Sequence, residues 1–297
     1  MVGPYHRRVD PVSNADQRST QRLHVGVTAA MVMRLAGEEA AHTDAGRTFV
    51  SQLDTGAGRV MAEHVAEHWP HARMHFILRK WQFWTWMNAI AVNTPAVGRQ
   101  VVVLGAGWSA MGVDWAHHCV EARVWEVDLH HLAEKERLVR RLFPVAADRM
   151  RMIEADLSNL STLLSGLRAK GWHADRPTLW VAEGLAYYLA PDRFAALMRA
   201  ALTFHPSNRA VIEFGLAYHL MRESIRARTA AYHGYLATQT GLTNLHSFDP
   251  SVFCLQSGAL PLSWADPSSM ELARNGRALM FTSPDDSGMR MAVLGPA

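Results

Sequence analysis

The sequence is short of cysteine, of charge and of long apolar runs, and each shortage excludes a class of protein. Its 297 residues include two cysteines, Cys119 and Cys254, which are too few for a disulfide framework. Charged residues make up 19% of the chain, below the ~25% of typical soluble domains, and 49% of the residues are hydrophobic. The chain can therefore bury a sizeable core and is not largely disordered. Its Trp- and Met-rich stretch, residues 81–92, is shorter than the ~20 residues that a membrane span needs.

Two further absences bear on partners and location. The net charge is +3 and Lys and Arg form no run or stripe, which argues against nucleic-acid binding. Residues 1–20 are polar and lack the apolar segment of a secretion signal. We therefore expect a cytoplasmic protein that binds neither nucleic acid nor membrane.

The first third of the chain has the residue pattern of helices. Apolar residues recur at helical spacing over 20–36, and further helices are predicted over 48–68 and 72–92, which end before Pro70 and Pro95. No alternation typical of a strand occurs before residue 99. We therefore expect residues 1–97 to form a helical lid over the remainder of the chain.

From Gln100 the pattern changes to strands that alternate with helices. Such alternation is typical of a doubly wound, mostly parallel sheet, so residues 98–297 are expected to form an α/β core. Near the C-terminus, 278–282 and 289–294 flank a turn-like Ser-Pro-Asp-Asp-Ser-Gly and predict an antiparallel hairpin at the sheet edge. The core strands are predicted at 100–104, 122–127, 150–154, 178–182 and 209–214, and the helices at 110–119, 130–143, 157–169 and 191–202.

A glycine-rich turn follows the first of these strands. Gly105 and Gly107 precede a helix, so the backbone can turn sharply and a ligand can approach it without meeting a Cβ atom. Asp128 ends the next strand, where its carboxylate can accept both hydroxyls of an adenosine ribose. Because open α/β sheets bind ligands at the carboxyl ends of their strands, the sequence predicts a cofactor crevice at this point.

Two kinds of cofactor fit this turn. Gly105-Ala-Gly107-Trp-Ser-Ala110 satisfies the loose Gly-x-Gly-x-x-Ala pattern of dinucleotide-binding proteins, so a nicotinamide-dependent oxidoreductase is one interpretation. An acidic stretch, Glu154-Ala-Asp156-Leu, comes with the end of the third strand, and a carboxylate there can accept a hydrogen bond from an adenine amino group, which suits a nucleoside-sized ligand better. The sequence has no cluster of Arg and Lys near these loops that could neutralise the charge of a pyrophosphate. We therefore favour the nucleoside-sized ligand.

The stretches 100–107, 124–129, 155–157 and 179–191, taken together, resemble the leucine carboxyl methyltransferase-like family of class I S-adenosylmethionine-dependent methyltransferases. The block Ala-Glu-Gly-Leu-Ala-Tyr-Tyr-Leu-Ala-Pro after the fourth strand is the most specific part of the resemblance. Many bacterial members of the family act on secondary metabolites. The resemblance implies a methyltransferase that uses S-adenosyl-L-methionine as its cofactor and a small molecule as its acceptor.

The resemblance also implies roles for particular residues. Gly105 and Gly107 would lie beneath the cofactor, and Asp128 would bind its ribose. Asp156 and Leu157 would bind the adenine. Glu183 would face the methionine amino group, and Arg79 or its neighbour Lys80 would bind the methionine carboxylate.

The sequence departs from the family at the glycine turn. Family members usually continue with an acid and an arginine, whereas here Gly107 is followed by Trp-Ser-Ala-Met. The acceptor of a typical member therefore does not carry over. A binding module that keeps the cofactor crevice without catalysis is a further alternative.

A general base is needed only if the acceptor loses a proton during methyl transfer. We prefer His219, because it follows the fifth strand by one helical turn and histidine titrates near neutral pH. Tyr188 and Glu213 are the next candidates, although Tyr188 could equally be a packing residue. Tyr218 and His233 are two more.

Aromatic and Met residues crowd positions 81–87, among them Trp84 and Trp86. Packing in the core or in a homo-oligomer is one interpretation of this cluster, and the wall of an acceptor pocket is the other. On the second interpretation we expect a compact aromatic or heteroaromatic secondary metabolite as the acceptor, methylated at oxygen, nitrogen or carbon. His64, Glu67 and His68 have the spacing of a zinc motif but lack a third ligand, so no metal site is expected.

Overall fold

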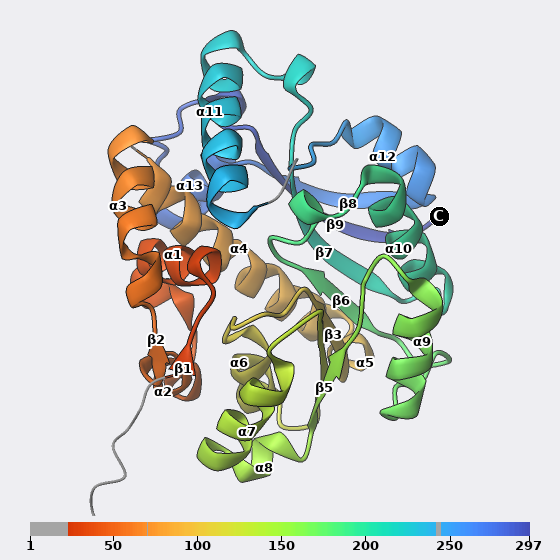
Figure 1. Cartoon of the computed structure of the whole chain (residues 1–297). Coiled ribbons are helices and arrows are strands. Elements are labelled where there is room, and N and C mark those ends of the chain that lie inside the picture. Colours follow the sequence, from red (N-terminus) through yellow and green to blue (C-terminus); the bar gives the residue numbers. More distant parts are fainter. Residues whose placement is uncertain (1–22, 70, 242–244) are drawn as a thin grey trace, which may run out of the picture.

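The protein is built around one seven-stranded sheet with helices on both faces (Figure 1). The computed structural model describes residues 23–69, 71–241 and 245–297. All strands run in the same direction except β9, which is antiparallel to both of its neighbours. In sheet order the strands are β5 (Met150–Glu154), β4 (Arg123–Asp128), β3 (Gln100–Leu104), β6 (Leu179–Ala182), β7 (Arg209–Gly215), β9 (Met289–Pro296) and β8 (Ala259–Ala265).

The centre of the sheet lies at β3, which is buried along its whole length. From β3 the chain continues outward to β4 and β5, and then returns to the other side to form β6 and β7. Leu104 at the end of β3 is in register with Val127 of β4 and with Ala182 of β6. The loops after these three strands therefore meet where the strand order reverses, which is the ligand-binding position in open α/β sheets.

Alternate residues of the strands point to opposite faces of the sheet, and each face has its own hydrophobic core. Val101 and Val103 of β3 belong to one core, and Val102 and Leu104 belong to the other. The first face is covered by α4 (Ala72–Asn93), α5 (Pro95–Gly98), α6 (Met111–His118), α7 (Leu132–Leu142) and α8 (Pro144–Ala147). The second face is covered by α9 (Leu160–Ala169), α10 (Pro191–Thr203) and α12 (Pro250–Ser257).

The N-terminal helices share the core of the first face. Met31, Phe83 and Val101 belong to one cluster of buried side chains, and the carboxylate of buried Asp114 accepts hydrogen bonds from the backbone of His42 and Thr43. The predicted boundary at residue 97 falls inside α5, shortly before β3, and the packing continues across it. The elements before α4 are β1 (Leu23–His24), α1 (Val27–Ala36), η1 (Gly37–Ala40), α2 (Asp44–Ser51), β2 (Leu53–Asp54), η2 (Gly56–Gly58) and α3 (Arg59–His68).

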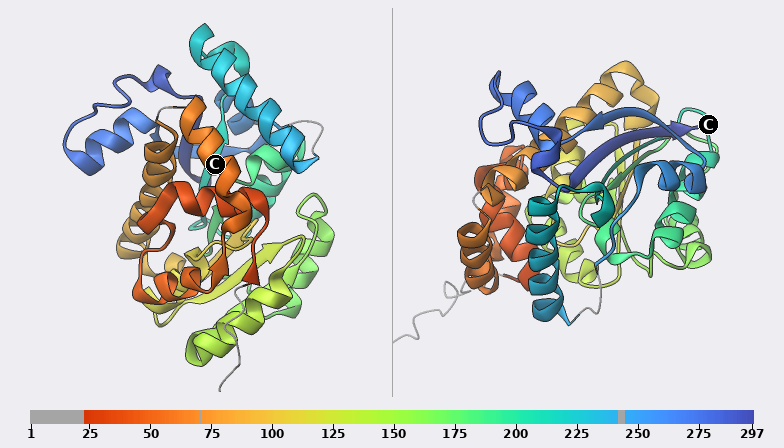
Figure 2. Two further views of the ribbon diagram at one scale, coloured as in Figure 1. Left: turned by 60° about the vertical axis from the view of Figure 1, so that its left-hand side comes forward. Right: turned by 90° about the horizontal axis from the view of Figure 1, so that it is seen from above.

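Two C-terminal helices pack against this N-terminal segment. α11 (Glu223–Thr240) stands beside α1 and α3, and α13 (Pro267–Asn275) packs against α4 (Figure 2). Segments 223–240 and 267–275 therefore lie beside the N-terminal helices in space although they are far from them in the sequence. Within the described ranges no helix has the length and apolarity to cross a membrane.

The five core strands lie within one residue of their predicted bounds, but the predicted edge hairpin is wrong. Residues 278–282 form no strand, and the N–H groups of Met280 and Phe281 donate to the Glu271 carboxylate at 2.9 Å instead. β9 pairs with β7 and with β8, so it is an inner strand. β8 was missed because Pro261 interrupts it beside a bulge and most of its side chains are exposed.

The helical prediction for the first third also needs correction. Residues 20–22 lie outside the described residues, and the helix predicted from there begins at α1. The helix predicted over 48–68 is broken into α2 and α3 by β2 and by η2, which contains two glycines. β1 and β2 pair in a short parallel ladder, so strands do occur before residue 99.

Candidate functional site

A cavity of about 630 Å³ opens at the carboxyl ends of β3, β4, β5 and β6. Its walls come from the loops after these strands and from α1, α4 and α11. The structure brings every residue that the sequence assigns to the cofactor to this one cavity. These residues are Arg79, Gly105, Gly107, Asp128, Asp156, Leu157 and Glu183, together with the alternative Lys80.

The glycine turn needs its glycines. Gly105 and Gly107 have φ angles of +66° and +43°, in the left-handed region that favours glycine. A Cβ atom at Gly105 would also lie 3.1 Å from Leu185 Cδ1. The N–H of Gly107 donates to Asp128 Oδ2 at 2.8 Å, and the N–H of Leu129 donates to Oδ1 at 2.7 Å. Each carboxylate oxygen of Asp128 can still accept a ligand hydroxyl, since it has a second lone pair.

A buried ion pair stabilises the glycine turn through a hydrogen bond to the backbone of the turn. Lys135 Nζ lies 2.8 Å from Glu126 Oε2 and donates to the backbone carbonyl of Ser109 at 2.7 Å. Both side chains are fully buried, so burial raises the pKa of Glu126 and lowers that of Lys135. Gly112 permits this arrangement, because a Cβ atom there would lie 2.2 Å from Glu126 Oε1.

Asp156 and Leu157 follow β5 at the far side of the cavity. The N–H of Ser158 donates to Asp156 Oδ1 at 2.8 Å, and hydrogen bonds from Ser158 lower the pKa of Asp156. Leu157 is buried. An ionised acceptor beside an apolar side chain fits the amino group and the ring of an adenine.

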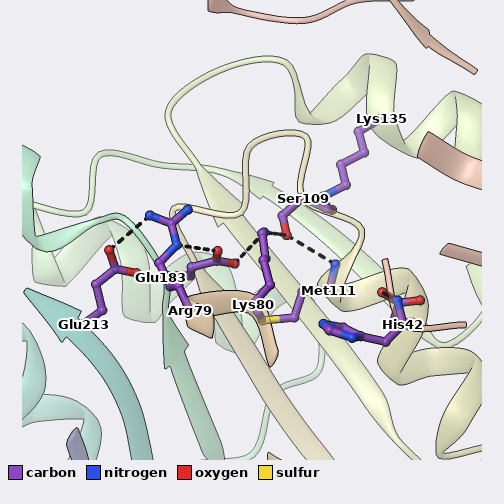
Figure 3. Close-up of polar contacts among 9 residues, drawn as sticks. His42, Arg79, Lys80, Ser109, Met111, Lys135, Glu183 and Glu213 are labelled. Atoms are coloured by element: carbon purple, nitrogen blue, oxygen red, sulfur yellow. Dashed lines mark hydrogen bonds and ion pairs between the residues drawn. The ribbon is translucent and has the colours of Figure 1, made fainter. Parts of the chain in front are cut away.

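Four charged side chains from separate elements form the charged quartet, Arg79 and Lys80 of α4, Glu183 after β6 and Glu213 of β7 (Figure 3). Arg79 Nε lies 3.1 Å from Glu183 Oε1, and Arg79 Nη1 lies 3.1 Å from Glu213 Oε1. Lys80 Nζ lies 2.8 Å from Glu183 Oε2 and 3.4 Å from the hydroxyl of Ser109 on the glycine turn. All four side chains are at most 8% exposed.

The surroundings of the two glutamates shift their pKa values in opposite directions. Burial favours the neutral form of Glu183, but Lys80 and Arg79 outweigh it and lower its pKa. Burial dominates at Glu213 and raises its pKa although Arg79 is close. Arg79 Nε and Glu183 Oε1 pair with each other by charge at 3.1 Å, but neither makes a hydrogen bond among the described residues. A buried donor beside a buried acceptor fits the carboxylate and the ammonium group of an amino-acid ligand such as methionine.

The opposite end of the cavity is lined by an aromatic chamber. Its rings form a connected wall, in which Trp69 lies 4.5 Å from His75 and 5.5 Å from Tyr232, centroid to centroid, and Tyr187 lies 6.0 Å from His233. Burial lowers the pKa of His75 to about 3 and that of His233 to about 4, so both rings are neutral at pH 7. The chamber comprises Trp69, His75, Phe76, Tyr187, Tyr232 and His233.

The structure places some of the predicted general-base candidates at the cavity and another on the surface. Tyr188 and Glu213 line the cavity, and Tyr188 is 44% exposed. His219 does not line it: in the short helix η4 (Tyr218–Leu220) the imidazole is exposed, with Nε2 3.6 Å from Asp249 Oδ2. The preference for His219 is therefore not supported by its position. His233 on α11 is the imidazole that reaches the cavity from the chain after β7.

The tryptophans at 81–87 do not form the acceptor wall. Trp84 stacks on His42 at 4.8 Å and lies edge-on to Trp115 at 5.7 Å, and neither Trp84 nor Trp86 lines the cavity. The pocket interpretation of this cluster is wrong, and the packing interpretation describes Trp84. His64 stacks on His68 and on Tyr235, and no group of three or more metal-ligating side chains occurs in the described part of the chain.

The architecture defines a class I methyltransferase fold, and two solved structures share it over nearly the whole chain. A DUF574 family protein from Streptomyces avermitilis aligns with 94% of this chain and 99% of its own, with a TM-score of 0.62 and 14% identity. A methyltransferase from Thermobifida fusca aligns with 94% of this chain and 97% of its own, with a TM-score of 0.63 and 15% identity. At these identities the likeness establishes the fold alone.

The sequence places the chain in a family. Residues 15–202 match the family model of leucine carboxyl methyltransferases, and the chain belongs to that family. A Mycolicibacterium smegmatis protein named as an S-adenosyl-L-methionine-dependent methyltransferase is 34% identical over 126 residues, 41% of this chain and 39% of that protein. A Streptomyces coelicolor protein named likewise is 38% identical over 103 residues, 34% and 32% of the two chains. The chain thus spans less than half the length of these relatives.

Proposed function

We propose that this protein transfers a methyl group from S-adenosyl-L-methionine to a small-molecule acceptor. The observation that carries the proposal is one cavity with two unlike ends, the strand-end loops at one and the aromatic chamber at the other, with the charged quartet between them and in contact with the chamber through Phe76 and Tyr187. A cofactor and an acceptor can lie in contact in such a cavity, away from bulk water. Family membership and the names of the relatives support methyl transfer over the nicotinamide alternative.

When bound, S-adenosyl-L-methionine supplies an electrophilic methyl group on a positively charged sulfur. In this proposal the protein contributes binding and orientation, which is the main source of rate acceleration in a direct displacement. Gly105 and Gly107 let the cofactor approach the backbone, and Asp128 accepts its ribose hydroxyls. Asp156 with Leu157 holds the adenine, and the charged quartet holds the methionine end.

We further propose a compact aromatic or heteroaromatic acceptor. Flat aromatic walls select flat ligands, and each ring contact adds roughly 0.5–1.5 kcal/mol beyond area burial. The buried cations Arg79 and Lys80 are already paired with glutamates, which disfavours a polyphosphate acceptor. A role in secondary metabolism, a cytoplasmic location and a homo-oligomer stay predictions from the sequence.

Calorimetry separates the candidate functions. We expect the protein to bind S-adenosylhomocysteine and not NAD or NADP. Methyl transfer from labelled S-adenosyl-L-methionine to a panel of aromatic compounds then distinguishes an enzyme from a binding module. Binding of a dinucleotide without binding of S-adenosylhomocysteine would overturn the proposal.

A further inference from the structure

The cavity contains several groups that could take a proton from an acceptor, and the structure distinguishes them. Four carboxylates and two imidazoles of the described residues line it. Asp128 and Asp156 lie at the strand ends, where the cofactor is proposed to bind. Glu183 and Glu213 are held by Arg79 and Lys80 in the charged quartet. Glu213 also borders the aromatic chamber through Tyr187, but its Oε1 is paired with Arg79 at 3.1 Å, so the two imidazoles are the candidates of the chamber that no ion pair holds.

The two imidazoles differ in how they are held. His75 lies one helical turn before Arg79 on α4, and its Nδ1 is buried without a hydrogen-bond partner among the described residues. Besides burial, the Arg79 charge disfavours protonation of His75. His233 is 7% exposed, and its Nδ1 lies 2.9 Å from the hydroxyl of Tyr218. Tyr218 thus orients the ring of His233 and leaves Nε2 for a ligand.

We propose that the acceptor is a hydroxyl-bearing aromatic ring and that Nε2 of His233 accepts the proton of this hydroxyl, with Tyr218 holding the imidazole through Nδ1. The inference rests on the proposed function and adds the chemical class of the acceptor to it. His233 touches the acceptor and is a catalytic residue, whereas Tyr218 acts through His233 and is a positioning residue.

The step balances without a further reactant. The acceptor oxygen forms a bond to the methyl carbon, the carbon–sulfur bond breaks, and its electron pair stays on sulfur. The O–H bond breaks, and the proton moves to Nε2 of His233 and then to solvent. Because the oxygen becomes positively charged as the new bond forms, its proton is strongly acidic and a weakly basic imidazole suffices. The protonated ring donates from Nδ1 to the Tyr218 oxygen.

Burial keeps the His233 ring neutral at pH 7, and the phenols that face it carry no charge. Tyr187, Tyr218 and Tyr232 surround it, and burial raises the pKa of all three phenols, so they stay uncharged. Arg228 on α11 also lines the cavity. Burial lowers the pKa of His233 itself to about 4, so the lone pair that the step needs is available.

The test compares hydroxyarenes with their methyl ethers on the full chain saturated with S-adenosylhomocysteine. The probes are phenol, 2-naphthol and 4-hydroxyindole, each beside its ether, and binding is measured by calorimetry. An ether keeps the ring and the oxygen, carries one additional methyl group and cannot donate a hydrogen bond. We expect at least one hydroxyarene to bind about tenfold tighter than its ether. His233→Phe should remove this preference, and His219→Gln, a control beside Tyr218 on the exposed surface, should keep it.

A second readout tests the orientation of the ring without turnover. In ¹⁵N-histidine NMR spectra of the S-adenosylhomocysteine complex, the signal that disappears in His233→Phe belongs to His233. We expect the neutral tautomer with the proton on Nδ1, and we expect Tyr218→Phe to abolish the dominance of that tautomer.

Each outcome of the two measurements bears either on the inference or on the proposed function. Absence of hydroxyarene binding, survival of the preference in His233→Phe, or a proton on Nε2 would each overturn the inference and leave the proposed function standing. Failure of S-adenosylhomocysteine to bind would overturn the proposed function itself.

Discussion

The two ends of the cavity are built in different ways. Apart from Arg79 and Lys80 of α4, the cofactor end consists of short loops that directly follow β3, β4, β5 and β6, so these functional residues stand next to strands that the sequence itself identifies. The aromatic chamber is assembled from Trp69 after α3, from the start of α4, from the segment after β6 and from α11, which are far apart in the sequence. A local pattern therefore predicts the first end, and only the tertiary structure shows the second.

The largest expected effect lies beneath the cofactor end. Lys135→Met leaves the Glu126 carboxylate buried and unpaired and frees the Ser109 carbonyl, so the free energy of unfolding should fall by about 3–5 kcal/mol. Urea unfolding measures the loss. Glu63→Gln, which removes the exposed pair with Arg59, is the matched control and should cost less than about 1 kcal/mol. Equal losses in the two variants would show that the buried pair does not hold the glycine turn.

The aromatic chamber should make stability depend on pH. Burial lowers the pKa of His75 from 6.5 to about 3, so the unfolded chain binds more protons than the folded one between these values. Stability is then complete above pH 6.5 and falls as the pH drops, by about 2–3 kcal/mol between pH 7 and pH 4.5 for this one histidine. Urea unfolding of His75→Leu at both pH values should show a smaller decrease than the wild type by that amount. Identical decreases in the free energy of unfolding of the two proteins would show that the imidazole of residue 75 is charged or exposed in the folded protein.

The site residues that the sequence identified after strands share one physical property, whereas Arg79 and Lys80 of α4 were identified from the family resemblance alone. Gly105, Asp128 and Glu183 each end or directly follow a buried strand, and parallel strands bring their carboxyl ends to one edge. Their positions at or directly after predicted strands were sufficient to predict that these three residues meet at one edge of the sheet. The roles of these residues toward a cofactor stay proposals.

His219 and Trp84 illustrate where such reasoning stops. His219 stands close to β7 in sequence, but the chain turns through η4 and leaves its side chain on the surface. His233 comes later in the chain, and α11 carries it back to the cavity. The aromatic content of α4 was recognised, but which face of the helix meets the cavity depends on α1 and α11, which no local pattern places.

A comparison of two tryptophans sharpens the assignment of the acceptor end. Trp69→Ala should weaken hydroxyarene binding by roughly fivefold, since it removes one wall of the chamber. Trp84→Ala should leave that affinity unchanged and lower the free energy of unfolding by roughly 1–3 kcal/mol instead. Calorimetry and urea unfolding on both variants measure this difference. The reverse assignment of the two effects would return the acceptor pocket to residues 81–87.

The smallest effect is expected at the exposed histidine. His219→Gln breaks only a surface contact with Asp249, so turnover should stay within about twofold of the wild type and stability within ~0.5 kcal/mol. Steady-state methyl transfer with an accepted hydroxyarene measures the first quantity. A loss of turnover without a loss of stability would bring His219 back as the general base.

Calorimetric titration of S-adenosylhomocysteine into the wild type, Asp128→Ala and Trp69→Ala tests the central claim, that one cavity has separate cofactor and acceptor ends. Asp128→Ala removes the carboxylate that we propose accepts two charge-assisted hydrogen bonds from the ribose, together with its contacts to the Gly107 and Leu129 N–H groups, and should weaken binding by about 100-fold or more. Urea unfolding, run in parallel, checks that this variant is folded. Trp69→Ala should bind S-adenosylhomocysteine as the wild type does. Unchanged affinity in Asp128→Ala, or an equal loss in both variants, would contradict the account.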